Sequence, residues 1–236
     1  MKKINVVSLL TGRGGSKLKD KNIIKIDGFP CLYYPCREVK KINSINHHFA
    51  SSDDDKILKL SNKYGMKKIK RPKKFSRPNS KHIEVLNHAL GVLDTKKIKV
   101  DILVVLLANA PIIKSKWIDD CIKIINRNKK ISAVVPVLKN NDHHPLRAVK
   151  KKNGYLTSFF KLKKKISTNR QELESNFFLA HNFWVIRTKF IKNKKNKIAW
   201  SFMGNKIVGY EIPFSIDIHS NLDVMIANHL VKNKLY

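Results

Sequence analysis

Val6-Val7-Ser8-Leu9-Leu10 is a short apolar run, and the glycine-rich stretch Thr11-Gly12-Arg13-Gly14-Gly15-Ser16-Lys17 follows it directly. A brief apolar run bounded by glycine is typical of a strand buried on both faces of a parallel sheet. A glycine-rich turn after such a strand lets backbone N–H groups approach an anion closely. The stretch therefore predicts an α/β fold with an anion-binding loop after its first strand.

Strands and helices alternate along the rest of the chain. Ile102 to Leu107 is the strongest central strand, and further strands are expected to end at Ser51 and to cover 132–138. Apolar residues at helical spacing predict helices over 31–39, 57–64, 80–93, 117–125 and 221–231, with Ser80 as the N-cap of the third. This alternation predicts one domain over residues 1–236, a Rossmann-like three-layer sandwich with a mainly parallel sheet. Its ligands are expected at the carboxyl ends of the strands.

From residue 140 to about 176 the alternation stops. The segment is polar and basic, with Tyr155, Phe159 and Phe160 set among lysines. A flexible surface loop is one interpretation of it. A structured insertion that packs on a second subunit explains the aromatic residues better, and we favour that interpretation.

The net charge is +32, and lysines are distributed along nearly the whole chain. A dedicated nucleic-acid binder usually concentrates its positive charge on one face or tail. Solvated faces therefore account for the pattern better than a nucleic-acid groove, and the sequence has no aromatic-rich RNA motif or helix-turn-helix pattern. The charge attracts anions in general and does not identify the partner.

Cysteine usage and hydropathy bear on the cellular compartment. Cys31, Cys36 and Cys121 form no CxxC pair and no Cys/His metal pattern, and their odd number favours reduced thiols in the cytoplasm. No apolar run approaches the roughly 20 residues of a transmembrane helix. The apolar stretch near the N-terminus is shorter than a signal peptide requires. We therefore expect a cytoplasmic protein without a membrane partner.

The glycine-rich loop has neither the P-loop spacing nor the GxGxxG spacing. Arg13 is able to bind phosphate oxygens in bidentate fashion, and Lys21 adds a mobile positive charge. Together they would neutralise a triphosphate as pyrophosphate leaves. Taken alone, the loop is equally compatible with a basic surface turn.

The loop is one of several ordered blocks through which the chain resembles the CMP-sugar synthetases, the family of acylneuraminate cytidylyltransferases, related to the CMP-Kdo synthetases. Gly12 to Lys17 and Lys21-Asn22 match the opening loop of that family, and Ser215-Ile216-Asp217-Ile218-His219-Ser220 resembles its closing segment. The blocks between them are, in chain order, Ser51 to Ile57, Tyr64-Gly65, Arg71-Pro72, His88-Ala89-Leu90, His143 to Arg147 and Arg170 to Leu173. Each block is weak alone, but the ordered set covers nearly the whole chain. The resemblance implies a nucleotide-diphospho-sugar transferase fold and transfer of CMP from CTP to an acidic nine-carbon sugar.

The chain departs from the family pattern at three places. The glutamine or aspartate expected after the central strand is Ala108 or Asn109 here, and an expected Asp-Thr reads Pro78-Asn79. The second aspartate of the closing segment is His219. These departures bear on whether the activity is reduced or lost.

By this resemblance, the phosphates of CTP are held by the glycine loop and by the polar residues beside it: Gly12, Arg13, Gly14, Gly15, Ser16, Lys21 and Asn22. Arg71, Ser80 and Asn109 are expected near the cytidine. The residues expected to carry catalysis are Arg13, Lys21 and Asp217.

The resemblance also implies Mg²⁺ as cofactor, with Asp217 as its main protein ligand. His219 lies two residues further on, so on a strand both side chains would point to the same face. His219 either binds the metal directly, holds a coordinated water or lies outside the site. Imidazole is a poor ligand for Mg²⁺ and a better one for Mn²⁺. We therefore expect Mn²⁺ to support activity at least as well as Mg²⁺.

For the sugar, the resemblance implies that Arg147 and Arg170 bind the carboxylate, since a guanidinium fork matches a planar acid. In the family such residues arrive from the neighbouring subunit, which implies a homodimer. Gln171, His181 and Asn182 are expected at the polar groups of the sugar. The sequence does not distinguish sialic, legionaminic and pseudaminic acids.

Three other functions remain open at this point. The first is a CMP-Kdo-like or other sugar nucleotidyltransferase, which substrate choice would separate. The second is a catalytically inactive nucleotide-binding or basic binding protein, which would bind CTP without releasing pyrophosphate. The third and least favoured is a nucleic-acid binder, whose affinity for oligonucleotides would depend steeply on salt.

Overall fold

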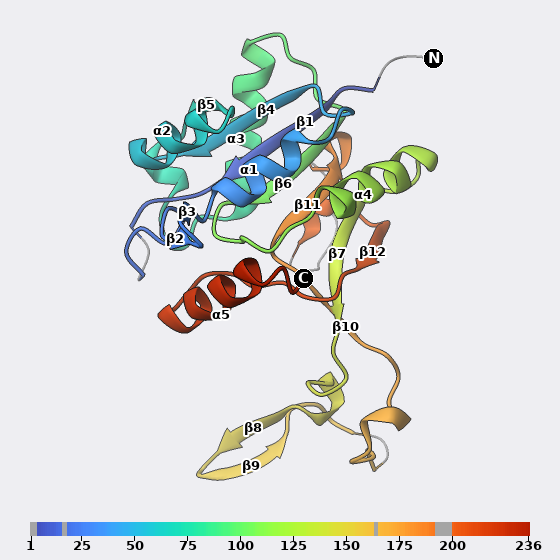
Figure 1. Ribbon diagram of the computed structural model, residues 1–236. Coiled ribbons are helices and arrows are strands. Elements are labelled where there is room, and N and C mark those ends of the chain that lie inside the picture. Colours follow the sequence, from blue (N-terminus) through green and yellow to red (C-terminus); the bar gives the residue numbers. More distant parts are fainter. Residues whose placement is uncertain (1–3, 16–17, 163–164, 192–199) are drawn as a thin grey trace.

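The structure is a computed structural model, and it describes residues 4–15, 18–162, 165–191 and 200–236. Within these residues one eight-stranded sheet has the order β10-β7-β11-β6-β1-β4-β5, and β12 pairs with β7. Its strands are β1 Val6–Thr11, β4 His47–Ser52, β5 Lys67–Lys70, β6 Ile102–Leu107, β7 Ala133–Lys139, β10 Phe177–Leu179, β11 Phe183–Arg187 and β12 Ile207–Glu211. Figure 1 shows helices on both faces of this sheet, which confirms the predicted three-layer α/β sandwich.

The sheet is mainly parallel, as predicted. β1 pairs in parallel with β4 and β6, and β4 pairs in parallel with β5. β12 is parallel to β7. β10 runs antiparallel to β7, and β11 runs antiparallel to both β6 and β7. These two strands therefore run against the direction that the other six strands of this sheet share.

Alternate residues of the central strands supply the two halves of the core. Val6 and Leu10 belong to a cluster with buried residues of α1 (Tyr33–Lys40) and α4 (Ser115–Arg127). Val7 and Leu9 belong to the opposite cluster, with residues of α3 (His82–Thr95). Because side chains alternate across a strand, a continuous apolar run is the composition that such a doubly covered strand requires.

The predicted helices form close to their predicted bounds. Besides α1, α3 and α4, they are α2 Asp55–Lys63 and α5 Asn221–Lys232. Asp54 is the N-cap of α2, and its Oδ1 accepts a hydrogen bond from Lys56 N at 2.7 Å. The predicted N-cap of α3 is wrong, because α3 begins after Lys81. The Ser80 hydroxyl instead bonds within the preceding loop, to Arg77 N and Lys74 O.

The four parallel strands β6, β1, β4 and β5 end at the same edge of the sheet (Figure 1). The segments that leave this edge contain the glycine loop after Thr11, Asp53 after Ser52, Arg71 after Lys70 and Ala108-Asn109 after Leu107. This is the edge at which such sheets bind ligands.

The segment from 140 to 176 contains a β-hairpin, β8 Val149–Lys152 and β9 Tyr155–Ser158, flanked by the 3₁₀ turns Pro145–Arg147 and Arg170–Glu172. Asn153 and Gly154 have φ of 50° and 86°, as a two-residue hairpin turn requires. Figure 1 shows the hairpin standing away from the sheet, beyond β10. Its side chains Tyr155 and Leu156 are 77% and 70% exposed. The packing of this segment on a second subunit stays a prediction.

Within the described part of the chain, no helix combines the length and the apolar character needed to cross a bilayer.

Candidate active site

A cleft of about 460 Å³ lies at the carboxyl edge of the sheet. It brings together residues of the glycine loop, the segment after β5, the end of β6 and the segment before α5. Among the residues predicted from the sequence, those that line it are Gly12, Arg13, Lys21, Asn22, Arg71, Ser80, Asn109, His181, Asp217 and His219. Gly14 and Gly15 line a small adjoining recess, together with Arg13, Lys21 and Asn22. Ser16 lies outside the described residues.

The glycine loop is held by its own backbone groups. Gly12 N donates to Ser51 O at 3.3 Å, Gly14 N donates to Asp53 Oδ1 at 3.2 Å, and Asn22 Nδ2 donates to Arg13 O at 2.8 Å. A Cβ atom on Gly12 would lie 3.0 Å from Ala108 Cβ. The buried Ala108 is therefore part of the fit, because a larger side chain there would crowd the loop further.

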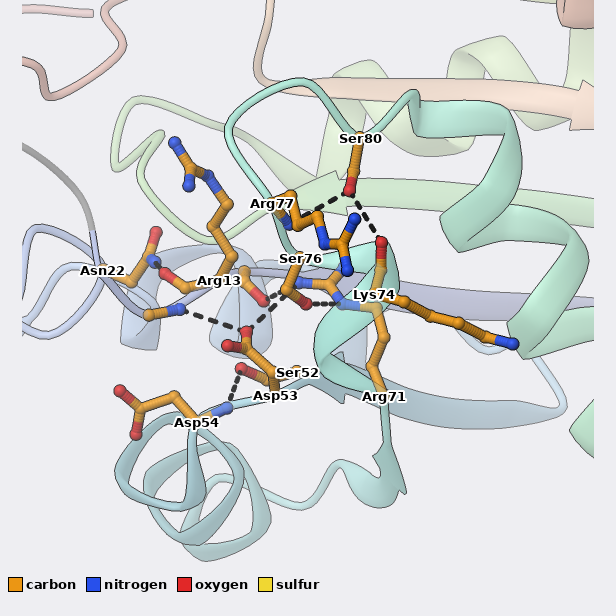
Figure 2. A network of polar contacts seen from close by, with 12 residues as sticks. Arg13, Asn22, Ser52, Asp53, Asp54, Arg71, Lys74, Ser76, Arg77 and Ser80 are labelled. Carbon is orange, nitrogen blue, oxygen red and sulfur yellow. Dashed lines mark hydrogen bonds and ion pairs between the residues drawn. The ribbon is translucent and has the colours of Figure 1, made fainter.

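Arg13 itself remains available to a ligand. Figure 2 shows its side chain pointing away from the contacts that hold its backbone. Within the described residues its guanidinium has no hydrogen-bond or ion-pair partner, and it lines the cleft. Lys21 lines the cleft as well. Burial lowers the pKa of Lys21 and the Arg13 charge adds to this, while Asp217 opposes the shift.

Arg71 is buried and its guanidinium is largely committed to the protein. Its Nη2 donates to Gly12 O at 2.6 Å, and its Nε donates to Ser76 Oγ at 2.8 Å. Asp53 Oδ1 lies 3.7 Å from Nη2 (Figure 2). Burial lowers the pKa of Arg71, and Asp53 opposes the shift. Arg71 was predicted near the cytidine, but its bonds mainly position the glycine loop and the loop that begins at Ser76.

Among the described residues that line the cleft, Asp217 is the acidic one. Its side chain is 23% exposed, and its Oδ2 lies 3.6 Å from His219 Nε2. Its Oδ1 is buried without a hydrogen-bond partner among the described residues. Burial raises the pKa of Asp217, against the opposing effects of His181, His219 and Lys21. A carboxylate in the lining of a cationic cleft, with one oxygen that has no donor among the described residues, is suited to a cation that arrives with the substrate.

Asn109 positions the Asp217 segment. Ile218 N donates to Asn109 O at 2.9 Å, and Asn109 Nδ2 approaches Ile218 O at 3.5 Å. The segment before α5 is thereby attached to the end of β6, which directs Asp217 and His219 to the cleft. No cluster of three or more His, Cys, Asp or Glu side chains suited to a metal occurs in the described residues. A metal at Asp217 would therefore need substrate oxygens and water as further ligands.

Of the predicted sugar-binding residues, His181 lines the cleft and the other four do not. Asn182 is a correction, because it is fully buried and its Nδ2 donates to Ile112 O at 3.3 Å. Arg147, Arg170 and Gln171 belong to the insertion and do not line the cleft of their own chain. Arg170 Nη1 instead bonds both carboxylate oxygens of Asp142, at 2.8 and 2.9 Å.

Sequence reasoning missed two titratable residues of the cleft, Arg77 and His82. His82 is the first residue of α3, and its ring centroid lies 5.1 Å from that of Trp184. Burial lowers the pKa of His82, and His181 and Arg71 add to the shift. No spacing signal distinguishes either residue, since Arg77 stands in a polar segment between elements and His82 is a lone histidine at the start of α3.

Comparisons with known proteins identify the family of the chain. Residues 7–200 match the family described as Cytidylyltransferase. The chain is 25% identical over 239 residues to post-translational flagellin modification protein B of Campylobacter coli, covering 97% of this chain and 96% of that protein. It is 30% identical over 107 residues to pseudaminic acid cytidylyltransferase of Campylobacter jejuni, covering 44% of this chain and 46% of that protein. N-acylneuraminate cytidylyltransferase A of Danio rerio is 22% identical over 230 residues, with 96% of this chain and 51% of that protein covered.

Solved structures share the fold. CMP:2-keto-3-deoxy-manno-octonic acid synthetase, solved in complex with CTP, superposes with a TM-score of 0.72 at 13% identity, covering 98% of this chain and 99% of that one. A 4-diphosphocytidyl-2C-methyl-D-erythritol synthase from Anaerococcus prevotii gives a TM-score of 0.66 at 13% identity, covering 98% and 100%. The family match over residues 7–200 establishes that the chain belongs to the cytidylyltransferase family, and the curated relatives support its acylneuraminate-type branch.

Proposed function

We propose that the protein transfers CMP from CTP to an acidic nine-carbon sugar of the sialic or pseudaminic acid type and releases pyrophosphate. The observation that carries this proposal is one cleft lined by Arg13, Lys21 and Asp217, in which, among the described residues, neither cation has a hydrogen-bond or ion-pair partner and Asp217 Oδ1 has no donor. The names of the relatives support the choice of nucleotide and of sugar class.

In this reaction a sugar hydroxyl oxygen attacks the α-phosphorus of CTP. The new P–O bond forms as the bond from the α-phosphorus to the bridging oxygen of the β-phosphate breaks, and the hydroxyl proton passes to water. Negative charge grows on the departing pyrophosphate, so fixed positive charge beside it lowers the barrier. Arg13 and Lys21 would provide that charge, and the loop glycines would let backbone N–H groups approach the phosphates.

A divalent cation fits the residues of the cleft, because Asp217 Oδ1 has no protein donor and His219 Nε2 lies close to Oδ2. Asp217 would hold the ion, with His219 as a second protein ligand. When bound, Mg²⁺ or Mn²⁺ would neutralise phosphate charge. The imidazole is the reason to expect Mn²⁺ to serve at least as well as Mg²⁺.

We further propose a homodimer in which the insertion brings Arg147, Arg170 and Gln171 to the partner's cleft. Their absence from the cleft of their own chain and the exposed apolar side chains of the hairpin support this arrangement.

The reduced, buried cysteines suit a cytoplasmic protein.

The test is product formation from CTP and a panel of nonulosonic acids and Kdo, followed by mass spectrometry, with ATP, GTP and UTP as matched nucleotides. A CMP-linked nonulosonate formed from CTP and not from the other nucleotides is the expected result. Preference for Kdo would reassign the sugar class, and the absence of any CMP-linked product would contradict the proposal.

A further inference from the structure

Two arginines close in sequence have opposite surroundings in the cleft. Arg71 is buried and bonded to Gly12 and Ser76. Arg77 is exposed and also lines the cleft, but its guanidinium has no hydrogen-bond or ion-pair partner in the part of the chain that the structure describes. The cleft wall therefore presents one guanidinium already used by the protein and a second one left for a ligand.

The backbone that carries Arg77 is fixed in place. Arg77 N donates to Ser80 Oγ at 3.0 Å, and Ser80 N donates to Arg77 O at 3.0 Å. The Ser80 hydroxyl also donates to Lys74 O at 3.2 Å, which closes the loop on its other side (Figure 2). The residue just before Arg77 is Ser76, whose hydroxyl accepts the bond from Arg71 Nε. A side chain on such a held loop loses less conformational entropy when it binds than one on a free loop.

The charge balance of the cleft favours an anionic partner for Arg77. Arg13, Lys21, Arg71 and Arg77 line the cleft with positive charge. Among the described residues, Asp217 is the acidic residue that lines it. A guanidinium presents a planar fork of donors that matches two oxygens of a phosphate or a carboxylate. An arginine that contacts solvent alone would not need a loop whose backbone is fixed by hydrogen bonds, in a cleft that is already positively charged.

We propose that Arg77 is a substrate-binding residue that pairs with an oxyanion in the cleft, either a phosphate of the nucleotide or the carboxylate of the acidic sugar. Arg71 then acts as a positioning residue for the glycine loop. The inference rests on the proposed function for the identity of the two substrates. It adds a ligand contact at a position where neither motif nor spacing indicates one.

The experiment compares Arg77→Gln with Lys73→Gln. Lys73 is an exposed lysine of the same segment that does not line the cleft, so its loss removes one charge without touching the site. Dissociation constants are measured by titration calorimetry, for CTP alone and for the sugar in the presence of CMP, which has no leaving group. Both variants are expected to keep the wild-type Tm, because both side chains are exposed.

Arg77→Gln should weaken one of the two ligands by at least about 10-fold, since a charge-assisted pair is lost, whereas Lys73→Gln should change either by less than about 2-fold. Loss of CTP affinity identifies the phosphate as the partner, and loss of sugar affinity identifies the carboxylate. Arg77→Lys should recover part of the loss, because charge returns without the fork.

Unchanged affinity for both ligands in Arg77→Gln, or equal losses in the two glutamine variants, would overturn the inference while leaving the proposed function intact. A wild-type protein that binds neither CTP nor the sugar would overturn both, and the wild-type titration separates these two failures.

Discussion

Arg71 Nη2 donates a 2.6 Å hydrogen bond to the carbonyl oxygen of Gly12, so the residue after β5 holds the loop after β1. The same guanidinium bonds Ser76 and lies near Asp53. One buried cation thus joins the segments that follow three neighbouring strands. The glycine loop is positioned by the protein before any ligand arrives, which is the condition under which its N–H groups can act on a developing charge.

Replacing Arg71 with Met should destabilise the protein by about 2–3 kcal/mol, because buried hydrogen bonds from a charged group are lost and Gly12 O is left without this donor. The free energy of unfolding in urea measures the effect, with Arg77→Gln as control at less than about 0.5 kcal/mol. Equal stability of the wild type and Arg71→Met would show that the hydrogen bonds from Arg71 to Gly12 and Ser76 do not contribute to the free energy of unfolding.

Gly12→Ala should weaken CTP binding by roughly 10-fold, because the new Cβ would lie 3.0 Å from Ala108 Cβ and the loop must move. The double variant Gly12→Ala/Ala108→Gly removes the close approach and should recover most of the affinity. Gly91→Ala is the matched glycine control. It lies in α3 with open space around a Cβ, so it should stabilise the protein by about 0.5–1 kcal/mol without affecting CTP.

Failure of the double variant to recover affinity would show that Gly12 is required for direct ligand contact. The steric explanation would then be wrong.

Glu38 should make stability depend on acid pH. Its carboxylate accepts from Lys41 Nζ at 2.6 Å, from Arg37 Nε at 2.9 Å and from Ser115 N at 3.1 Å, which links α1 to the start of α4. Burial acts to raise the pKa of Glu38, but these bonds and charges outweigh it and the pKa is lowered. A lowered folded-state pKa means that the contribution is present above the unfolded value and is lost as pH falls through the folded one.

Glu38→Gln should therefore be less stable than the wild type by about 1–3 kcal/mol at pH 7, and the difference should shrink below about pH 4. Denaturant titrations at pH 7, 5 and 3.5 measure this. A difference that stays constant over that range would assign the effect to packing alone.

Removing the divalent cation with a chelator should abolish CMP transfer, and Mn²⁺ should restore it at least as well as Mg²⁺. Mn²⁺ binding followed by electron paramagnetic resonance in the presence of CTP should weaken by about 10-fold or more in Asp217→Asn and by less in His219→Ala. His219→Asp should shift the preference toward Mg²⁺, since a carboxylate replaces imidazole. Clearly higher turnover of the wild type with Mg²⁺ would argue against a direct bond from His219.

The sequence predicts best those features that depend on local composition. Ile102 to Leu107 is β6 at its observed bounds, because a strand buried on both faces needs an unbroken apolar run. β5 was missed because Ile69 is its one buried residue, so an edge strand of lysines carries no periodic signal. The antiparallel course of β11 was also missed, since strand direction depends on connections rather than on composition.

Part of the site was also predicted, because short local motifs mark some of its residues. Motif positions identified Arg13, Lys21 and Asp217, which meet in the cleft. Asn182 was misplaced because a buried core amide and a ligand-binding amide look alike in a sequence. Arg71 and Arg77 look equivalent as well, and their different surroundings become visible only when Gly12 and Ser76 are placed beside Arg71.

The most direct test of the account is ³¹P NMR of the wild-type protein with CTP, Mn²⁺ or Mg²⁺ and a nonulosonic acid, with Asp217→Asn run in parallel. The account predicts that the triphosphate signals are replaced by pyrophosphate and one phosphodiester signal only when the sugar is present, and that Asp217→Asn slows this by at least about 100-fold. Bound CTP that stays intact with every sugar would contradict it.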